Sequence, residues 1–458
     1  MMEQSNMPCK HYDKMHEWDL YAKQLRTELR QSLEEGLAIE QYKSLFESVI
    51  AMPLDENKEK MANVLFDIVS QASLREDYAY CEPSDLPSIL AARNPALPGK
   101  QGSALPDDLR DRIRGAWYGR IIGCLLGKPV EGIRTDELLP LLKGSDNYPM
   151  HRYILSSDVT EEQMKNYRFR LAGRCFADTV DAAPVDDDTN YTVLYQMVID
   201  KYGRDFTPYD VARMWVAKQS KNAYCTAERV SYLNFVNGYL PPDSAVYKNP
   251  YREWVGAQIR GDYFGYINPG DPETAADMAW RDASVSHIKN GIYGEMFISA
   301  AIACAAVTDD VEQILLGGLA QIPATSRLYE AVMNVIEQHK QGVSAEAFFA
   351  DLHTRWDEYN VHDWCHTVSN AEIVSAAILW SDGDYERAIC MAVEQGFDTD
   401  CNGATIGSIL GMRGGMRVIG QKWLDPLHGK LKTSIFGIDT VEIETLVERT
   451  VKHLAANS

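Results

Sequence analysis

The sequence predicts an all-α protein, and three observations support this. Apolar residues recur at the three- and four-residue spacing of helices through most of the 458 residues. The alternating apolar and polar pattern of strands is nearly absent. Two segments carry glycine at every fourth position, which on a helix makes a groove without side chains. We therefore expect a compact multi-helix core with an added helical region at the N-terminus.

Residues 1–80 are predicted to form the helical N-terminal region. Leu25, Leu29 and Leu33 recur every four residues, and residues 59–70 carry a second apolar run at helical spacing. Residues 81–107 follow as a linker or extended arm, because this stretch is rich in residues that break both helices and strands. These residues are Pro83, Pro87, Pro95, Pro98, Gly99, Gly102 and Pro106.

Residues 108–458 are predicted to form one helical catalytic domain. Residues 370–380 have one apolar helix face, Asp384 is placed to cap the next helix, and Gly396 is placed to end it. Segments 144–180 and 238–272 are rich in Tyr, Pro, Asn and Gly and lack this periodicity. Long loops in a compact domain are usually functional or disordered, so we expect these two segments to form walls of a cleft.

The glycine segments are 115–127 and 403–411. Each glycine inside a helix costs about 0.5–1 kcal/mol relative to alanine, so close backbone packing must offset several kcal/mol. We expect two central helices packed tightly against each other. The residues that follow Gly127 and precede Gly403 are then held rigidly.

Composition excludes several classes of protein. A formal net charge of −21 repels phosphate groups, and no basic run offers a local exception, so nucleic acid is not an expected partner. No apolar stretch approaches the roughly 18 residues of a membrane span, and the first residues do not resemble a signal peptide, so we expect a cytoplasmic protein without a membrane partner. The nine cysteines are scattered and form no C-x-x-C pair, which argues against a disulfide framework or a structural zinc site.

Acidic residues gather where helices are expected to end or begin. Asp186, Asp187 and Asp188 precede an apolar helical run, while Asp398 and Asp400 precede the second glycine segment. Glu131 follows the first glycine segment. Helix capping is one explanation, since Asp is a preferred cap and a negative charge suits a helix N-terminus.

Capping needs only one carboxylate for each helix, which leaves the others to be explained. If the helix ends converge, unit charges about 4 Å apart repel by roughly 4 kcal/mol per pair at an effective dielectric near 20. A divalent cation relieves this repulsion, and oxygen ligands without a His or Cys cluster favour Mg²⁺, with Mn²⁺ or Ca²⁺ as alternatives. Five aspartates exceed what one Mg²⁺ usually takes from a protein, so two ions are expected.

These motifs, in this order, resemble the ADP-ribosylglycohydrolase family, including the dinitrogenase-reductase-activating glycohydrolases. The matching residues lie in the glycine segment ending at Pro129 and Glu131, in Asp187-Asp188-Thr189, and in Asp398-Thr399-Asp400 with the glycines up to Gly411. The resemblance covers roughly residues 110–420. It implies an all-α fold with two Mg²⁺ or Mn²⁺ ions that grip the 2- and 3-hydroxyls of a ribose whose anomeric bond is hydrolysed.

The resemblance also implies roles for individual residues. The metal ligands that it implies are Asp187, Asp188, Asp398 and Asp400, and the acidic cluster adds Asp186 as a fifth expected ligand. The candidates for the general base are Glu131 and one of Asp187 or Asp398, between which the sequence does not choose. His287 lies in a segment similar to the family's Ser/Thr-His motif and is an expected substrate contact; a core histidine is the alternative. Asn268 and Gly270, in the place of the family's phosphate-binding loop, are also expected to contact substrate.

Three residues depart from the family pattern. Asp186 stands where relatives usually carry Ser or Thr, Cys401 stands in place of Thr or Ser, and Cys124 in place of an Asp. Thiol is a poor ligand for Mg²⁺, so Cys401 removes a hard oxygen donor. The phosphate-binding glycine loop is replaced by residues 263–270.

The expected function is therefore Mg²⁺- or Mn²⁺-dependent hydrolysis of an N- or O-glycosidic bond in an ADP-ribosyl or related ribosyl substrate. The partner is a small ribosylated ligand or an ADP-ribosylated protein. One alternative is a glycohydrolase of a nucleoside or other metabolite without a diphosphate, in which tyrosines and Trp254 of the 238–272 segment stack on a base or, alternatively, only pack. A second is an inactive binding protein on the same scaffold.

Overall fold

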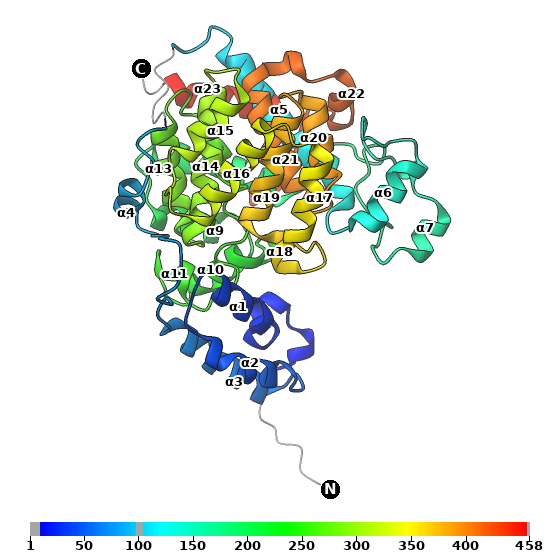
Figure 1. Cartoon of the computed structure of the whole chain (residues 1–458). Helices are drawn as coiled ribbons and strands as arrows, with labels where there is room; N and C mark the ends of the chain where they lie inside the picture. Colours follow the sequence, from blue (N-terminus) through cyan, green and yellow to red (C-terminus); the bar gives the residue numbers. More distant parts are fainter. Residues whose placement is uncertain (1–9, 98–103, 456–458) are drawn as a thin grey trace.

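The structure is a computed structural model that describes residues 10–97 and 104–455. Helices make up most of it, which confirms the predicted all-α fold (Figure 1). In the described residues the only sheet is an antiparallel hairpin of β1 (Lys430–Ile435) and β2 (Ile438–Glu442). No helix of this part of the chain is both long and apolar enough to cross a membrane.

The N-terminal helices have an apolar cluster of their own. It includes Leu25, Phe46, Leu65 and Phe66, all almost fully buried. The helices and short 3-10 helices of this region are η1 (Tyr12–Lys14), η2 (Glu17–Asp19), α1 (Tyr21–Glu34), η3 (Glu40–Tyr42), α2 (Lys43–Ile50) and α3 (Glu56–Ser70). Two predicted apolar runs thus form α1 and α3.

Ion pairs join this region to the rest of the chain. In Figure 1, α1–α3 lie at one end of the molecule, beside α10 and α18. Arg252 holds Glu28 of α1 at 2.9 Å, and Arg229 holds Asp19 at 2.7 Å. Because these pairs are largely buried, removing one partner leaves an uncompensated charge.

The predicted linker runs over the surface of the core. It contains α4 (Leu86–Ala91), and the backbone N–H of Cys81 donates to the carbonyl of Thr325 at 3.2 Å. Glu82 pairs with Arg327 at 2.9 Å. Pro98, Gly99 and Gly102 lie outside the described residues, and the predicted domain boundaries stay a prediction.

The core begins with α5 and ends with α23. Its first half contains α5 (Leu109–Gly127), η4 (Lys128–Val130), α6 (Thr135–Gly144), η5 (Ser156–Asp158), α7 (Glu161–Asn166), α8 (Asp187–Tyr202), α9 (Pro208–Lys218), η6 (Lys221–Ala223), α10 (Thr226–Val236), α11 (Asp243–Val246), α12 (Asp262–Tyr266) and α13 (Pro272–Ala283). Its second half contains α14 (Lys289–Ala305), α15 (Val311–Leu319), α16 (Arg327–Lys340), α17 (Ala345–Arg355), α18 (Val361–Cys365), α19 (Thr367–Trp380), α20 (Tyr385–Val393), α21 (Thr399–Gly414), η7 (Gly415–Val418), α22 (Gln421–Leu424), η8 (Asp425–Leu427) and α23 (Ile443–Ala455).

Several local predictions are confirmed. Residues 370–380 lie in α19, and the Asp384 carboxylate caps α20 by accepting the N–H of Arg387 at 2.8 Å. Gly396 has φ +69° just after α20, a left-handed conformation that glycine readily adopts at the end of a helix.

The expectation that segment 238–272 lines a cleft holds for Val246, Lys248, Asn249 and Arg252, which line a cavity beside the N-terminal helices, but not for most of the residues that follow. Residues 249–268 are almost entirely buried, because they pack between α8, α14 and the N-terminal helices. The hairpin at 430–442 was not predicted. Its buried Leu431 and Ile435 alternate with more exposed positions, the signal that would have indicated a strand.

Candidate metal centre and active site

Helices α5 and α21 pack antiparallel through their glycines, as predicted from the glycine spacing. A Cβ atom built on Gly119 would lie 2.1 Å from the carbonyl oxygen of Gly407. One built on Gly123 would lie 1.9 Å from that of Gly403. No side chain fits between the two backbones, so the helices cannot slide without separating.

This packing brings the C-terminus of α5 to the N-terminus of α21. The Thr399 hydroxyl donates to the carbonyl of Gly127 at 2.9 Å, and a Cβ on Gly127 would meet the Thr399 carbonyl carbon at 2.2 Å. Lys128 and Glu131, which follow α5, are therefore held near Asp400 in the first turn of α21.

The N-terminus of α8 joins them through a buried arginine. Arg120 of α5 donates to the backbone carbonyl of Asp188 at 2.8 Å and to its carboxylate at 3.2 Å. The same guanidinium donates to Asp262 at 2.8 Å, and all three side chains are fully buried. Arg120 thus ties α5, α8 and α12 together.

Three helix ends therefore converge on a shared acidic cluster. Ligand atoms of Cys124, Asp186 and Asp188 lie within 4.8 Å of one another, and so do those of Asp188, Asp400 and Cys401. Asp188 belongs to both groups. The acidic motifs that are far apart in the sequence meet at this point.

Burial and mutual repulsion raise the pKa of most carboxylates of the cluster. Asp187, Asp188 and Asp400 have pKa values well above the usual range, chiefly because burial disfavours their charged forms and secondly because neighbouring carboxylates repel. The same causes raise the pKa of Asp398 to about 7 and raise that of Glu131. Burial and mutual repulsion thus both oppose full ionisation of the cluster.

Asp186 is the exception. Burial acts to raise its pKa as well, but Lys128 outweighs burial and the net direction is downward. The Lys128 ammonium contacts one carboxylate oxygen, and the other oxygen accepts the backbone N–H of Asp188 at 2.9 Å as the cap of α8. Asp186 has a partner at each carboxylate oxygen.

The donors fit a divalent cation. Asp188 Oδ2 and Asp400 Oδ1 are buried and have no hydrogen-bond partner among the described residues. A buried carboxylate oxygen without a partner is costly, and a cation satisfies it while relieving the repulsion. Carboxylate oxygens suit Mg²⁺ or Mn²⁺, whereas the Cys401 thiol beside them is a softer donor.

The sequence model of the ADP-ribosylglycohydrolase family matches residues 105–457. The chain belongs to this family. No curated protein matches the chain. One solved structure, described as an ADP-ribosylglycohydrolase-related protein complex, aligns with a TM-score of 0.47 and 17% sequence identity, covering 77% of this chain and 100% of that one.

The predicted catalytic carboxylates of this family member differ in exposure. Glu131 and Asp187 keep some solvent exposure, whereas Asp398 is buried. Asp398 precedes α21 but its side chain makes no capping hydrogen bond, and the Cys365 thiol lies 3.9 Å from its Oδ2. Its carboxylate is therefore not consumed by helix capping.

The predicted substrate contacts lie in other hydrogen-bond networks. The His287 ring is fully buried, with Nδ1 at 2.8 Å from the Ser286 hydroxyl, and burial lowers its pKa well below the usual value. The Asn268 amide donates to the Phe264 carbonyl at 2.8 Å, and the Gly270 N–H donates to a carbonyl of α14 at 2.8 Å. Their roles in substrate binding stay predictions.

Aromatic residues that were considered as a stacking surface for a base form part of the core. Tyr263 and Tyr266 are fully buried against Trp117 of α5, with ring centroids 6.2 and 5.6 Å away. Tyr239 stacks on Tyr247 at 3.9 Å. These rings pack against one another, which was the alternative explanation.

Two residues of the cluster were missed from the sequence. Arg120 lies inside the glycine segment. Its partners come from α8 and α12, so the neighbouring sequence does not indicate them. Lys128 is the one basic residue between the glycine segment and Glu131. A lysine next to a predicted acidic cluster was the available signal.

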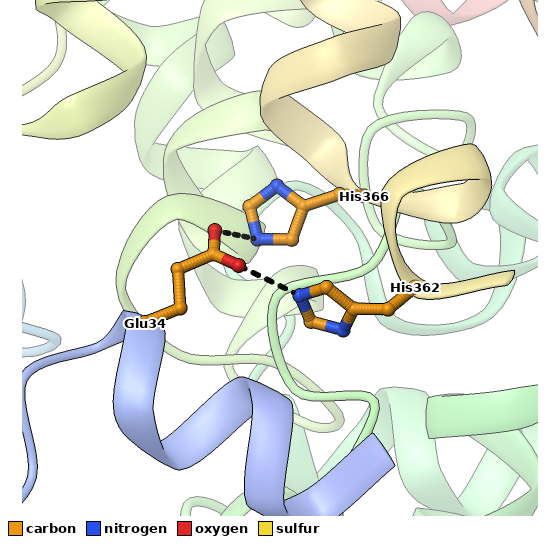
Figure 2. Close-up of side chains that lie close together, drawn as sticks. All are labelled: Glu34, His362 and His366. Carbon is orange, nitrogen blue, oxygen red and sulfur yellow. Dashed lines mark hydrogen bonds and ion pairs between the residues drawn. The ribbon is translucent and has the colours of Figure 1, made fainter. Parts of the chain in front are cut away.

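A second group with metal-ligand chemistry lies between the N-terminal region and the core (Figure 2). Glu34 Oε2 is 2.9 Å from His362 Nε2, and Glu34 Oε1 is 3.3 Å from His366 Nε2. Nδ1 of each histidine already accepts an N–H, from the Trp254 indole and from the backbone of Val368, both at 3.1 Å.

These acceptor roles decide the protonation of both rings. A neutral histidine whose Nδ1 accepts must carry its proton on Nε2, the atom that faces Glu34. A metal on Nε2 would need that proton to move to Nδ1, against a donor. The group is therefore a clamp in which a hydrogen bond from His362 to Glu34, with His366 in contact with the same carboxylate, attaches α1 to α18 and α19. Burial opposes ionisation of Glu34, but the two histidines and Arg327 outweigh it and lower its pKa to about 2.

Proposed function

We propose that this chain hydrolyses the anomeric N- or O-glycosidic bond of an ADP-ribosyl or related ribosyl substrate, with a divalent cation, Mg²⁺ or Mn²⁺, at the acidic cluster. The observation that carries the proposal is the pair of buried, partnerless oxygens of Asp188 and Asp400, which lie where three helix ends converge in an ADP-ribosylglycohydrolase. Asp188 and Asp400 would hold the cation. Asp187 and Asp398 are further candidate ligands.

Solvent exposure distinguishes the roles of the other carboxylates of the cluster. A general base must reach the attacking water, and Glu131 and Asp187 are the carboxylates of the cluster with solvent exposure. We assign the proton from water to a carboxylate oxygen of Glu131. Asp187, beside it, is placed to stabilise the positive charge that develops on the sugar as the bond breaks.

A bound cation supplies orientation of the ribose hydroxyls and a lower pKa for a water molecule. The fixed geometry of the cluster comes from the backbone contact between α5 and α21 and from Arg120. Because Arg120 is fully buried and satisfies the carbonyl of Asp188, the first turn of α8 keeps its place whether or not the cluster is charged.

A substrate without a diphosphate is a second candidate, and the burial of residues 263–270 favours it. This segment stands where relatives carry a phosphate-binding loop. Its backbone is buried, and the N–H of Gly270 is already used by the carbonyl of Ala303. It offers no exposed row of N–H groups for phosphate oxygens.

A hydrolysis screen tests the proposal. The purified chain is incubated with Mg²⁺ or Mn²⁺ and with ADP-ribosyl-arginine, ADP-ribosyl-serine, O-acetyl-ADP-ribose or plain nucleosides, and released sugar is quantified. We expect turnover of at least one substrate that disappears in Asp187→Ala and persists in Asp439→Ala, an exposed aspartate of β2. Turnover that survives in Asp187→Ala would contradict the assigned site.

A further inference from the structure

Lys128 takes up a carboxylate that the cluster would otherwise offer to a cation. Its ammonium contacts Asp186 Oδ2, while Asp186 Oδ1 accepts the N–H of Asp188 at 2.9 Å. Asp186 is 4% exposed, so its carboxylate is shielded from solvent and both of its oxygens have their partners within the protein. The group of Cys124, Asp186 and Asp188 is thus already occupied by a positive charge.

The free donors lie in the other group. Asp188 Oδ2 and Asp400 Oδ1 are buried without a partner, and ligand atoms of Asp188, Asp400 and Cys401 lie within 4.8 Å of one another. These three side chains are at most 7% exposed. The unsatisfied oxygens therefore belong to Asp188 and Asp400, and neither of them is hydrogen-bonded to Lys128.

We propose that the Lys128 ammonium takes the place of a second metal ion, so that the cluster holds a single divalent cation between Asp188 and Asp400. The proposal rests on the proposed function only for the kind of cation. An ammonium is a compact monovalent charge at the end of a flexible chain, and it occupies the space and the oxygen that a second ion needs. It also repels a second divalent ion at close range.

The backbone keeps the ammonium in place. Lys128 begins η4 directly after α5, and the carbonyl of Gly127, one residue earlier, accepts the Thr399 hydroxyl at 2.9 Å. The root of the lysine is thus fixed against α21. Of the lysine side chain 21% is exposed, so the ammonium reaches the cluster from its open side.

The test counts ions. The full chain, freed of metal with a chelator and dialysed, is titrated with Mn²⁺ by calorimetry, and the spin coupling of bound Mn²⁺ is read by electron paramagnetic resonance. We expect one Mn²⁺ per chain and an uncoupled spectrum. Lys128→Met should bind two Mn²⁺ with a coupled spectrum, whereas Lys128→Arg, which keeps the charge, should bind one. Lys165→Met, at an exposed lysine of α7, is the matched control and should bind one.

Removing the ammonium alone leaves Asp186 buried without its partner, which endangers folding. The double variant Lys128→Met with Asp186→Thr removes both charges and keeps an oxygen to cap α8; it should bind two Mn²⁺. Two ions or none in the unaltered chain, or one ion in folded Lys128→Met or in the folded double variant, would overturn the proposal. Since the count needs no substrate, an inactive chain that binds one ion would sink the proposed function alone, and an active chain that binds two would sink this inference alone.

Discussion

The closest backbone contact in the site, between Gly123 and Gly403, allows a quantitative prediction. The Gly123→Ala variant adds one methyl group in the middle of the α5 and α21 interface. Its Cβ would lie 1.9 Å from a carbonyl oxygen, about 1.5 Å short of the 3.4 Å where ordinary contact begins. The atoms that it meets are backbone atoms of a 16-residue helix, so no side chain can turn away.

Two effects of opposite sign set the magnitude. Alanine is favoured over glycine inside a helix by about 1 kcal/mol. Overpacking costs typically about 1–3 kcal/mol and more where the neighbours cannot move. Since the helices must separate along their length, we expect the upper end of this range or above it, and a net loss of about 2 kcal/mol in the free energy of unfolding.

Urea unfolding followed by circular dichroism measures this loss. Gly144→Ala is the matched control, because Gly144 ends α6, has no heavy atom within 4 Å of a built Cβ and does not need a left-handed backbone. Its change should stay within about 0.5 kcal/mol. If Gly123→Ala were as stable as Gly144→Ala, the backbone contact would not hold the two helices together as described.

Three further predictions concern the cluster and the clamp. Asp400→Asn should weaken Mn²⁺ binding at least tenfold in calorimetry while the circular dichroism spectrum stays unchanged, since it removes a charged donor with a partnerless oxygen; unaltered affinity would exclude Asp400 as a ligand. Glu131→Gln should lower kcat by about 10²- to 10⁴-fold with little change in KM, as expected for loss of a general base. A rise in KM with kcat unchanged would show that Glu131 binds substrate instead. Acid should weaken the clamp. Burial lowers the pKa of His366 from 6.5 to about 4, so the free energy of unfolding falls as pH drops through this interval. The pKa of Glu34 is lowered from 4.5 to about 2, which adds a loss of up to about 3 kcal/mol as pH drops from 4.5 to 2. Proteolysis of the N-terminal region at stepwise lower pH measures this release, and Glu34→Gln should abolish the step below pH 4.5.

The glycine spacing predicted the central helix pair because it depends only on local geometry. Residues four apart share a helix face, so a stripe of glycines indicates close packing in any tertiary context. The acidic cluster followed from the same logic, since Asp187 and Asp400 both lie in the first turn of a helix. A local sequence pattern does not show which residues from distant parts of the chain will contact a given side chain.

The misjudged segments show this limit. Residues 249–268 have the composition of a loop, yet they are buried, because Arg252 pairs with Glu28 of α1 at one end of the segment and α12 packs against α14 at the other. Irregular composition predicts missing helices but not exposure. Lys128 was likewise visible in the sequence, but its contact with Asp186 depends on the meeting of α5 and α8.

The pair of Lys128 and Asp186 also explains how this chain tolerates an additional buried carboxylate. Asp186 stands where relatives carry a neutral hydroxyl, and a buried charge without a partner costs about 3–5 kcal/mol. Lys128 removes that cost and, by the same contact, the electrostatic need for a second cation. The lysine and the aspartate then act as one pair, since removal of the lysine alone leaves a buried carboxylate without its charged partner. The number of cations that this cluster binds then depends on the charge of its own side chains, which the Mn²⁺ count for Lys128→Met measures.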